Sequence, residues 1–459
     1  MRLAFAFRIF SLFFLILILS SCTTNTPDVE LPTQFRHSNN DLNDTKNLPY
    51  LAWWNQLEDK TLNELINIGL ANNFDIQIAN ANLEQARGQL RQVELSWLPF
   101  VNIYGGFSQS PTFGSPGVFY GIFPQYFINL LQLPFKQKQA NYNLALHQAK
   151  ISAARLTLIG QITTSYITYI AELEQLKLLQ TLEKDLNALT KIKLQAFQGG
   201  IASQQSAELL KSDTQMVVAQ QQVVKHNLVV SQNAIRYLLN QNPGNIEAGT
   251  NFAKLNDNFI DPQSLPSTVL ANRPDLLMAE MQLKIANEGI NISATQLFPI
   301  LVLDDFVDKQ SNHGTWAKPN TFGRVQDAYI NWQINPSVLG AIEASQGGYK
   351  AATFNYIKTV RQILREVDID FAANSYYKQK LNAEKQAYIN TSKEYSLQES
   401  LYKNSIIAYT ELLNSKIRLD NLALSVNQTK LQYFLCQVVL FQDLAGGYNY
   451  NLKEDVNVK

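Results

Sequence analysis

The residues with the clearest chemical meaning lie at the start of the chain. An apolar run from Ile9 to Leu19 follows Arg2 and Arg8. It is too short to cross a bilayer and is typical of a signal peptide. The run ends in Leu19-Ser20-Ser21-Cys22, a sequence that resembles a bacterial lipobox, in which the cysteine thiol accepts a lipid. We therefore expect residues 1–21 to be removed and Cys22 to carry a covalent lipid. The alternative is an ordinary secretory signal followed by a chance cysteine.

A second group of residues has side chains that could bind a metal ion. Asp304, Asp305, Asp308 and His313 lie close together in the sequence. Consecutive residues of a strand point to opposite faces, so we interpret them as strand or loop acids and expect no metal site. The four histidines are scattered without ligand spacing, and Cys436 has no evident histidine partner. We expect no catalytic residues, no enzyme activity and no cofactor besides the lipid.

Composition narrows the remaining classes of protein. The chain has 38 basic and 38 acidic residues, a balance that argues against a nucleic-acid partner. With two cysteines there is no disulfide framework, and we expect Cys436 to be a small buried apolar residue. No later apolar stretch approaches the roughly 20 residues of a membrane helix. If the mature chain crosses a membrane, it must do so as strands.

The elements that would position such residues are mainly long helices. All 15 prolines lie outside 135–242 and 337–459, and proline-free windows are what long helices require. Apolar residues at steps of three and four from Ile162 to Leu189 predict a helix of coiled-coil type over 136–197, about 90 Å long. After Gly199-Gly200 a return helix is expected from Gln204 to Asn240. The second window predicts helices over 341–402 and from about Ala408 to Leu444.

An internal repeat links the two windows. Leu70-Ala71-Asn72 recurs as Leu270-Ala271-Asn272, and further matches share the 200-residue offset. They are Asp75, Ala79, Leu83, Ala86 and Pro99, which recur as Asp275, Ala279, Leu283, Ala286 and Pro299. Each repeat is therefore expected to contain a helix, a strand pair and a long helical hairpin.

The strand pairs are expected at 99–134 and 299–336, with loops at 109–117 and 309–324. Residues 328–335 alternate between apolar and polar, as a membrane barrel strand requires. Trp97 and Trp332 would serve as interfacial anchors. Four strands cannot close a barrel, and open edges are not tolerated in lipid. The chain is therefore expected to oligomerise, and three copies would supply twelve strands.

Together these features resemble the outer membrane factors of the TolC and OprM type, in the lipoprotein branch that works with resistance-nodulation-division (RND) pumps. The matching segments are Trp53-Trp54 with Leu62, Leu65 and Ile66, Asn233-Ala234 with Leu238-Leu239 and Pro243-Gly244, Leu265-Pro266, Arg273-Pro274-Asp275-Leu276 with Ala279-Glu280, Phe298-Pro299, and Leu444-Ala445-Gly446-Gly447-Tyr448. The resemblance covers about residues 50 to 450. Arg273 and Asp275 are expected to pair across Pro274.

The resemblance implies a homotrimer in the outer membrane of a Gram-negative bacterium. Twelve strands would form a β-barrel, continued into the periplasm by an α-helical barrel, and Thr23 after Cys22 fits outer-membrane sorting. An adaptor protein and an inner-membrane RND transporter would be its partners, and drugs or small molecules would leave through it. Two alternatives stay open: an outer-membrane component of type I protein secretion, and a non-channel periplasmic coiled-coil lipoprotein.

The resemblance also assigns roles at the hairpin tips. Adaptor docking falls on two groups of residues, for which ordinary connecting loops are the alternative. They are Gly200, Ile201, Ala202 and Ser203 in the first tip, and Ser405, Ile406, Ile407 and Ala408 in the second. Ser405 stands where the family has glycine, so a different turn is expected there. The pore constriction falls on Glu411 and Asn414, and Ser206 holds the equivalent place in the first hairpin. A carboxylate ring from Glu411 would favour cations, although a solvated surface acid is equally compatible.

The segments expected along the chain are a signal peptide 1–21, a lipidated linker 22–50, a periplasmic helix 51–98, a strand pair 99–134, a hairpin 135–242, an equatorial linker 243–266, a periplasmic helix 267–298, a strand pair 299–336, a hairpin 337–445 and an equatorial tail 446–459. Tyr166 and Tyr169 are expected to pack within the first hairpin rather than to bind a ligand.

Overall fold

A computed structural model describes residues 27–32, 35, 45–108, 117–201, 203–256, 266–310 and 321–449. The expected signal peptide, Cys22, Ala202 and His313 lie outside the described residues. The chain divides into two compact units. We call 86–146 with 279–358 the strand unit, and 31–85 with 147–278 and 359–459 the hairpin unit.

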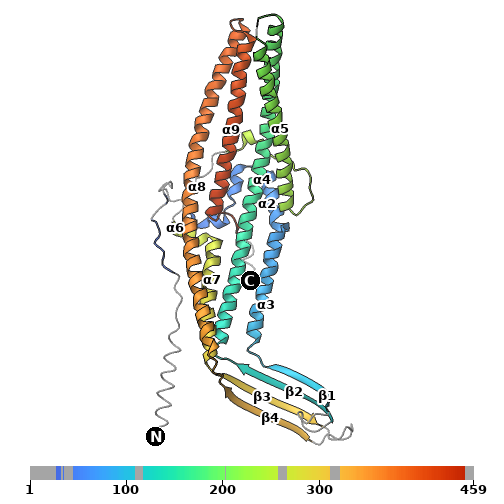
Figure 1. Ribbon diagram of the computed structural model, residues 1–459, viewed down its shortest axis with the longest axis vertical. Coiled ribbons are helices and arrows are strands. Elements are labelled where there is room, and N and C mark those ends of the chain that lie inside the picture. The colour runs from blue at the N-terminus through green and yellow to red at the C-terminus, as the bar shows by residue number, and fades with distance from the viewer. Residues whose placement is uncertain are drawn as a thin grey trace. The chain divides into compact units, whose positions relative to one another are not determined.

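The same order of elements occurs twice (Figure 1). The first repeat contains α2 (Lys60–Asn72), α3 (Phe74–Leu95), β1 (Phe100–Ser108), β2 (Gly117–Ile128), α4 (Leu133–Gln198) and α5 (Gln204–Leu238). The second contains α6 (Pro266–Asn272), α7 (Pro274–Ala294), β3 (Ile300–Gln310), β4 (Thr321–Asn331), α8 (Ser337–Lys403) and α9 (Tyr409–Asp443). Short 3₁₀ helices are η1 (Thr45–Tyr50), η2 (Trp53–Leu57), η4 (Phe252–Lys254) and η5 (Thr295–Leu297). The predicted duplication of helix, strand pair and helical hairpin is confirmed.

Three boundaries differ from expectation, two between helices and one at the end of a strand. Each segment expected as one helix before a strand pair is two helices, separated at Asn73 in the first repeat and at Arg273 in the second. The Asn73 side chain caps α3 by accepting the main-chain N–H of Asp75 at 2.8 Å, and Pro274 cannot continue a preceding helix. The last strand ends at Asn331, four residues before the end of the alternating pattern. Alternation shows which residues share a face of the sheet, but it does not show where the strand ends.

The strand unit contains a four-stranded antiparallel sheet in the order β1-β2-β3-β4. Strands β1 and β4 are therefore its edges. Apolar side chains on both edge strands are open to the surroundings, with Ile103 80% and Ile330 71% exposed. At the start of α4, Gln132 and Gln139 donate to the main-chain oxygens of Ile292 and Ile285 in α7. Among the described residues, no helix has the length and apolar character needed to cross a membrane.

The hairpin unit is built on a heptad seam. Leu179, Leu182 and Leu186 of α4 are buried against Val217 and Val224 of α5. This seam confirms the predicted stripe on the first long helix, since steps of three and four keep one helix face toward its partner. Partly buried side chains of α9 pack against the same cluster.

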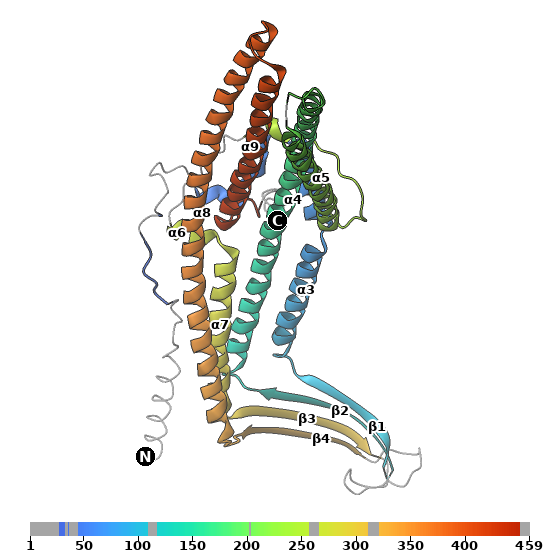
Figure 2. The ribbon, with the colours of Figure 1, turned by 45° about the horizontal axis from the view of Figure 1, so that its top comes forward.

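The four long helices of this unit lie in the order α5, α4, α9, α8 (Figures 1 and 2). Asn427 of α9 donates to the main-chain oxygen of Ala171 in α4 at 3.1 Å. Gln437 of α9 donates to the Asn374 side chain of α8 at 2.6 Å. The two hairpins therefore meet through α4 and α9, which leaves α5 and α8 as the outermost helices of the layer.

A buried lysine fixes the segment between the repeats. Lys430 is 6% exposed, and its ammonium donates to the main-chain oxygens of Phe252, Ala253 and Leu255 at 2.9, 3.1 and 3.0 Å. It also lies over the rings of Phe252 and Phe434. Three carbonyls and two aromatic faces replace its water shell. The linker is thus held on α9 by one charge.

Replacing Lys430 with Met should release this linker. The change keeps the apolar stem but leaves three carbonyls without their donor, which destabilises the packed linker by about 3 kcal/mol. Limited proteolysis of the detergent-solubilised protein should then cleave within 243–256. Lys254→Met is the matched control, because Lys254 lies in the same linker and is exposed. Equal protection of both variants would contradict this role for Lys430.

Candidate functional site

The first hairpin ends in a glycine turn. Gly200 has φ +72°, its N–H donates to the Phe197 oxygen at 2.9 Å, and the N–H of Ile201 donates to the Ala196 oxygen at 2.8 Å. These two bonds define a Schellman motif, which satisfies carbonyls at the end of α4. Ile201 is 85% exposed beyond the turn, and Ser203 follows as the residue before α5.

The second hairpin ends in the same turn, and the expectation of a different one is wrong. Ser405 has φ 58° and donates to the Tyr402 oxygen at 2.9 Å, and Ile406 donates to the Leu401 oxygen at 3.0 Å. A left-handed residue other than glycine is disfavoured by about 1 kcal/mol, which the two bonds offset. Ile406 is 66% exposed. Each turn therefore presents one exposed isoleucine.

The two residues that follow Ile406 in the second turn differ in their exposure. Ile407 is half-buried, and Ala408 is exposed and directly precedes α9. Glu411 and Asn414 are both exposed, three residues apart on one face of α9. Glu411 lies in the first helical turn, where the helix dipole favours a negative charge. Ser206 is half-buried and donates to the Ser203 oxygen at 2.9 Å.

Below the turns, charged residues join the two hairpins. Lys416 of α9 forms an ion pair with Asp420 of the same helix and lies 4.0 Å from Asp185 of α4. Burial raises the pKa of Asp420, and a hydrogen bond with the Asp185 carboxyl raises it further, against the opposing effect of Lys416. The cluster therefore sets two carboxyl groups beside one ammonium, at the contact between the two hairpins. This inter-hairpin cluster was not predicted from the sequence, although the Lys416 and Asp420 spacing of four was visible.

Next to Lys416, a hydrogen bond joins the two helices of the second hairpin. The Ser415 hydroxyl donates to the Glu394 carboxylate of α8 at 2.9 Å. Ser415 is fully buried. Because Lys416 and Ser415 are adjacent on α9, movement of this helix near the turn alters its contacts with both α4 and α8.

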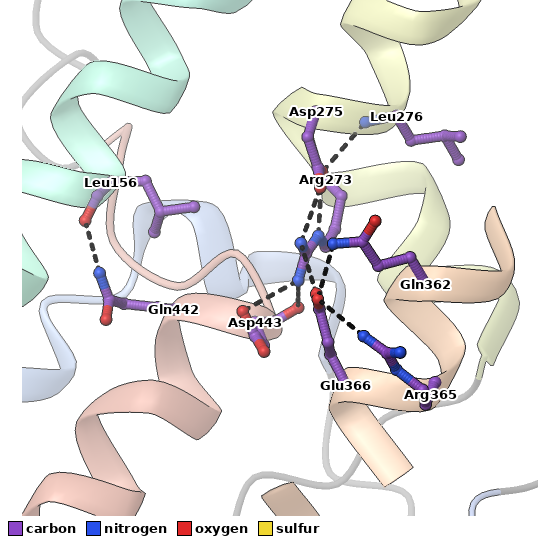
Figure 3. A network of polar contacts seen from close by, with 9 residues as sticks. All are labelled: Leu156, Arg273, Asp275, Leu276, Gln362, Arg365, Glu366, Gln442 and Asp443. Atoms are coloured by element: carbon purple, nitrogen blue, oxygen red, sulfur yellow. Dashed lines mark hydrogen bonds and ion pairs between the residues drawn. The ribbon is translucent and has the colours of Figure 1, made fainter. Parts of the chain in front are cut away.

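At the other end of the hairpins, Arg273 holds a second polar network (Figure 3). Its guanidinium binds Asp275 with two bonds of 2.9 and 2.7 Å, which confirms the predicted pair. It also donates to the main-chain oxygen of Asp443 at 3.0 Å and lies 3.7 Å from Glu366. Burial opposes the charge, but the hydrogen bond to Asp275 and the three carboxylates raise the pKa of Arg273 overall.

The first repeat uses a neutral residue at the same place. Asn73, 200 positions before Arg273, donates to the main-chain oxygen of Leu238 at 3.0 Å. Leu238 and Asp443 are the last residues of α5 and α9. The last carbonyls of a helix have no partner within it. In both repeats, therefore, the residue at the break between the two short helices satisfies the end of the return helix.

Asp370 extends the second network. Burial, a hydrogen bond with Asp443 and the charges of Asp443 and Glu366 raise the pKa of Asp370 from 3.8 to about 8, against the opposing charge of Arg273. The raised pKa favours the protonated form of this side chain at neutral pH. The same surroundings, burial first and then Asp370, raise the pKa of Cys436. Cys436 is half-buried rather than fully buried, and its thiol is not activated.

The remaining predicted residues have structural surroundings. Tyr166 and Tyr169 are buried and donate to Asp59 and to the Ile246 oxygen, both at 2.7 Å, which confirms packing roles. The Trp332 indole donates to the Leu297 oxygen and is 62% exposed. The side chains of residues 304–308 lie outside the described part of the chain. Within that part, no group of three potential ligands could hold a metal ion.

Replacing Asp370 with Asn tests whether the raised pKa of this side chain contributes to stability. Because the pKa is raised on folding, the stabilisation is complete below pH 3.8 and is lost as pH rises through about 8. The thermal unfolding temperature of the wild type should therefore fall over this range, and the variant should flatten that fall. Asp213→Asn, an exposed acid on α5, should leave the wild-type slope. Identical slopes for the wild type and Asp370→Asn would contradict this contribution of Asp370 to stability.

Comparison with known proteins finds a family match in each of the two repeats. The profile of the family described as outer membrane efflux protein matches residues 65–241 and again 265–442. The solvent efflux pump outer membrane protein SrpC of Pseudomonas putida is 24% identical over 418 residues, which cover 85% of this chain and 86% of that protein. The probable outer membrane lipoprotein SilC of Salmonella typhimurium is 23% identical over 463 residues, covering 94% and 97%.

The fold agrees with a solved structure as well. The open-state MtrE outer membrane channel of Neisseria gonorrhoeae superposes with a TM-score of 0.80 at 21% identity, over 93% of this chain and 98% of that one. Because the family profile covers both repeats and most of the chain, the protein belongs to the outer membrane efflux protein family.

Proposed function

We propose that this protein is the exit duct of a tripartite RND-type efflux pump, a homotrimeric channel anchored in the outer membrane. The observation that carries the proposal is the four-stranded sheet with β1 and β4 as unpaired edges. An open edge leaves main-chain groups without partners, which lipid does not tolerate. Three copies would join β4 of one to β1 of the next and close twelve strands.

The lipid anchor and the cargo follow from the same assignment. SilC is named as a probable outer membrane lipoprotein, which supports a lipid on Cys22 and an outer-membrane location with the hairpins in the periplasm. SrpC is named for solvent efflux, which supports small molecules as the exported class. The duct is passive, so we place the choice of substrate in the transporter.

The turns are proposed as the docking ends for a periplasmic adaptor. Ile201 and Ile406 are exposed at equivalent positions of two equal turns. Exposed apolar side chains at paired positions are typical of an interaction surface. The proposed gate is the inter-hairpin cluster of Asp185, Lys416 and Asp420, because it joins α4 to α9 below these turns.

The Glu411→Ala substitution tests the proposed constriction. Three Glu411 carboxylates around a narrow pore favour cations, so single channels in planar bilayers should lose cation preference in the variant. Asn414→Asp should increase that preference by adding a second acid one turn away. Glu208→Ala is the matched control, since this exposed acid lies two residues, or about 200°, around α5 from Ser206. Unchanged selectivity in Glu411→Ala would move the constriction elsewhere.

The Lys416→Met substitution tests the proposed gate. It leaves the half-buried Asp185 and the buried Asp420 without their ammonium, so the two carboxylates repel one another whenever both are ionised. Single-channel conductance should rise as the hairpins separate, and more so at alkaline pH. Lys211→Met is the control, because Lys211 is exposed and pairs only locally with Glu208 among the described contacts. Equal conductance in Lys416→Met and the wild type would exclude a gate at this cluster.

A further inference from the structure

A cavity lies between the linker that joins the two repeats and the helices of both hairpins. Its volume is about 460 Å³, which is within the range of small-molecule sites in proteins. It is lined by α4 of the first hairpin, by α8 and α9 of the second, and by linker residues 252–256. All four segments belong to the hairpin unit of one chain. The cavity is therefore complete without a second copy, and none of the roles proposed above uses it.

The inner surface of the cavity is mainly apolar. Phe252 and Leu255 of the linker line it and are almost fully buried, at 1% and 4% exposed. Leu178 of α4 and Ala423 and Val426 of α9 are half-buried beside them. Three segments of the chain thus offer apolar contact to a molecule in the cavity, which favours a ligand with an apolar body.

The charges around the cavity are predominantly positive. Lys430 lines it from the buried side and has its three N–H groups on linker carbonyls, so it supplies charge but no free donor. Lys254 is exposed and Lys385 is half-buried. Among the lining residues the one acid is Glu174, which forms an ion pair of 3.5 Å with Lys177, a residue outside the lining. The cavity therefore favours an anion over a neutral molecule or a cation.

An aromatic residue stands beside one of these lysines. Tyr388 of α8 lines the cavity and is 37% exposed. It follows Lys385 by three residues, so the two side chains lie on one face of the helix. The ring of a tyrosine stacks on other aromatic groups, and its hydroxyl can donate to an anion. This pair suits a molecule that joins an aromatic ring to a negative charge.

We infer that this cavity binds a small organic anion with an aromatic body, of the aromatic carboxylate class. The ring lies against the apolar lining and Tyr388, and the carboxylate lies on the side of Lys254 and Lys385. Such a molecule contacts α4 as well as α8 and α9, so it joins both hairpins to the linker. Binding therefore stabilises this arrangement of the hairpin unit.

Isothermal titration calorimetry of the full-length protein in lipid nanodiscs tests the site. The probes are 2-naphthoate and its uncharged counterpart 2-naphthamide, and empty nanodiscs measure the part that enters lipid. We expect one 2-naphthoate per chain, bound about tenfold more tightly than the amide, because the ammonium groups attract only the anion. Added salt should weaken only the anion. Equal affinities of the two probes, or no heat beyond that of empty nanodiscs, would overturn the inference.

Variants of the lining show where the anion binds. Lys254→Gln and Lys385→Gln should each weaken 2-naphthoate by about three- to tenfold and leave 2-naphthamide unchanged, since each removes one charge. Lys380→Gln is the matched control, because this lysine of α8 is exposed, lies outside the lining and pairs with Glu384. An equal loss in Lys380→Gln, or no loss in both lining variants, would overturn the site.

Filling the cavity gives a second, independent test. Ala423→Trp should abolish the binding of both probes, because the larger ring occupies the space that they need. Circular dichroism shows whether this variant is folded, and the two lysine variants decide the question if it is not. In the wild type 2-naphthoate should also raise the thermal unfolding temperature, an effect that a folded Ala423→Trp should lack. Unchanged binding in that folded variant would place the anion elsewhere and overturn the site.

Discussion

The last carbonyl groups of the two return helices must be satisfied, and the rest of the structure depends on how this is done. Leu238 and Asp443 end α5 and α9, and each offers its main-chain oxygen to the residue at a helix break, Asn73 or Arg273. A helix of 35 residues has no partner of its own for these groups. The contact fixes where each short helix pair changes direction and where each return helix ends.

The two repeats satisfy the same constraint with different chemistry. Asn73 supplies a neutral amide, whereas Arg273 brings a charge that gathers Asp275, Glu366 and Asp443 around it. The hairpins differ in a related way. The exposed face of α5 is apolar, with Met216 and Val223, while the equivalent places on α9 hold Asn421 and Gln428. The two repeats of one chain therefore present different surfaces at equivalent positions. This difference suits a ring in which the two hairpins contact different neighbours.

The sequence predicted what depends on local patterns. Proline-free windows and steps of three and four located the long helices, and the 200-residue offset revealed the duplication. The break at Asn73 was missed because asparagine also occurs inside helices, so the residue type alone did not show that its side chain caps a new helix. The turn at Ser405 was expected to differ because its side chain disfavours a left-handed conformation. Two backbone hydrogen bonds, invisible in the sequence, hold it there.

Contacts between distant segments could not be predicted in this way. The Arg273 and Asp275 pair lies within one motif and was expected, whereas the partners from α8 and α9 are about 90 and 170 positions away. The same applies to Asp185 beside Lys416, and to Lys430 beneath the linker. In each case the residue type is ordinary for a helix surface. Its role appears only when the fold removes it from water.

The central claim is that one chain builds one third of a closed channel. Native mass spectrometry of the protein released from detergent micelles tests it most directly, because it counts chains without assuming a shape. The account predicts a particle of three chains, each heavier than its mature polypeptide by the lipid on Cys22. A single chain per particle, with the same lipid attached, would contradict the channel and favour a lipid-anchored coiled-coil protein.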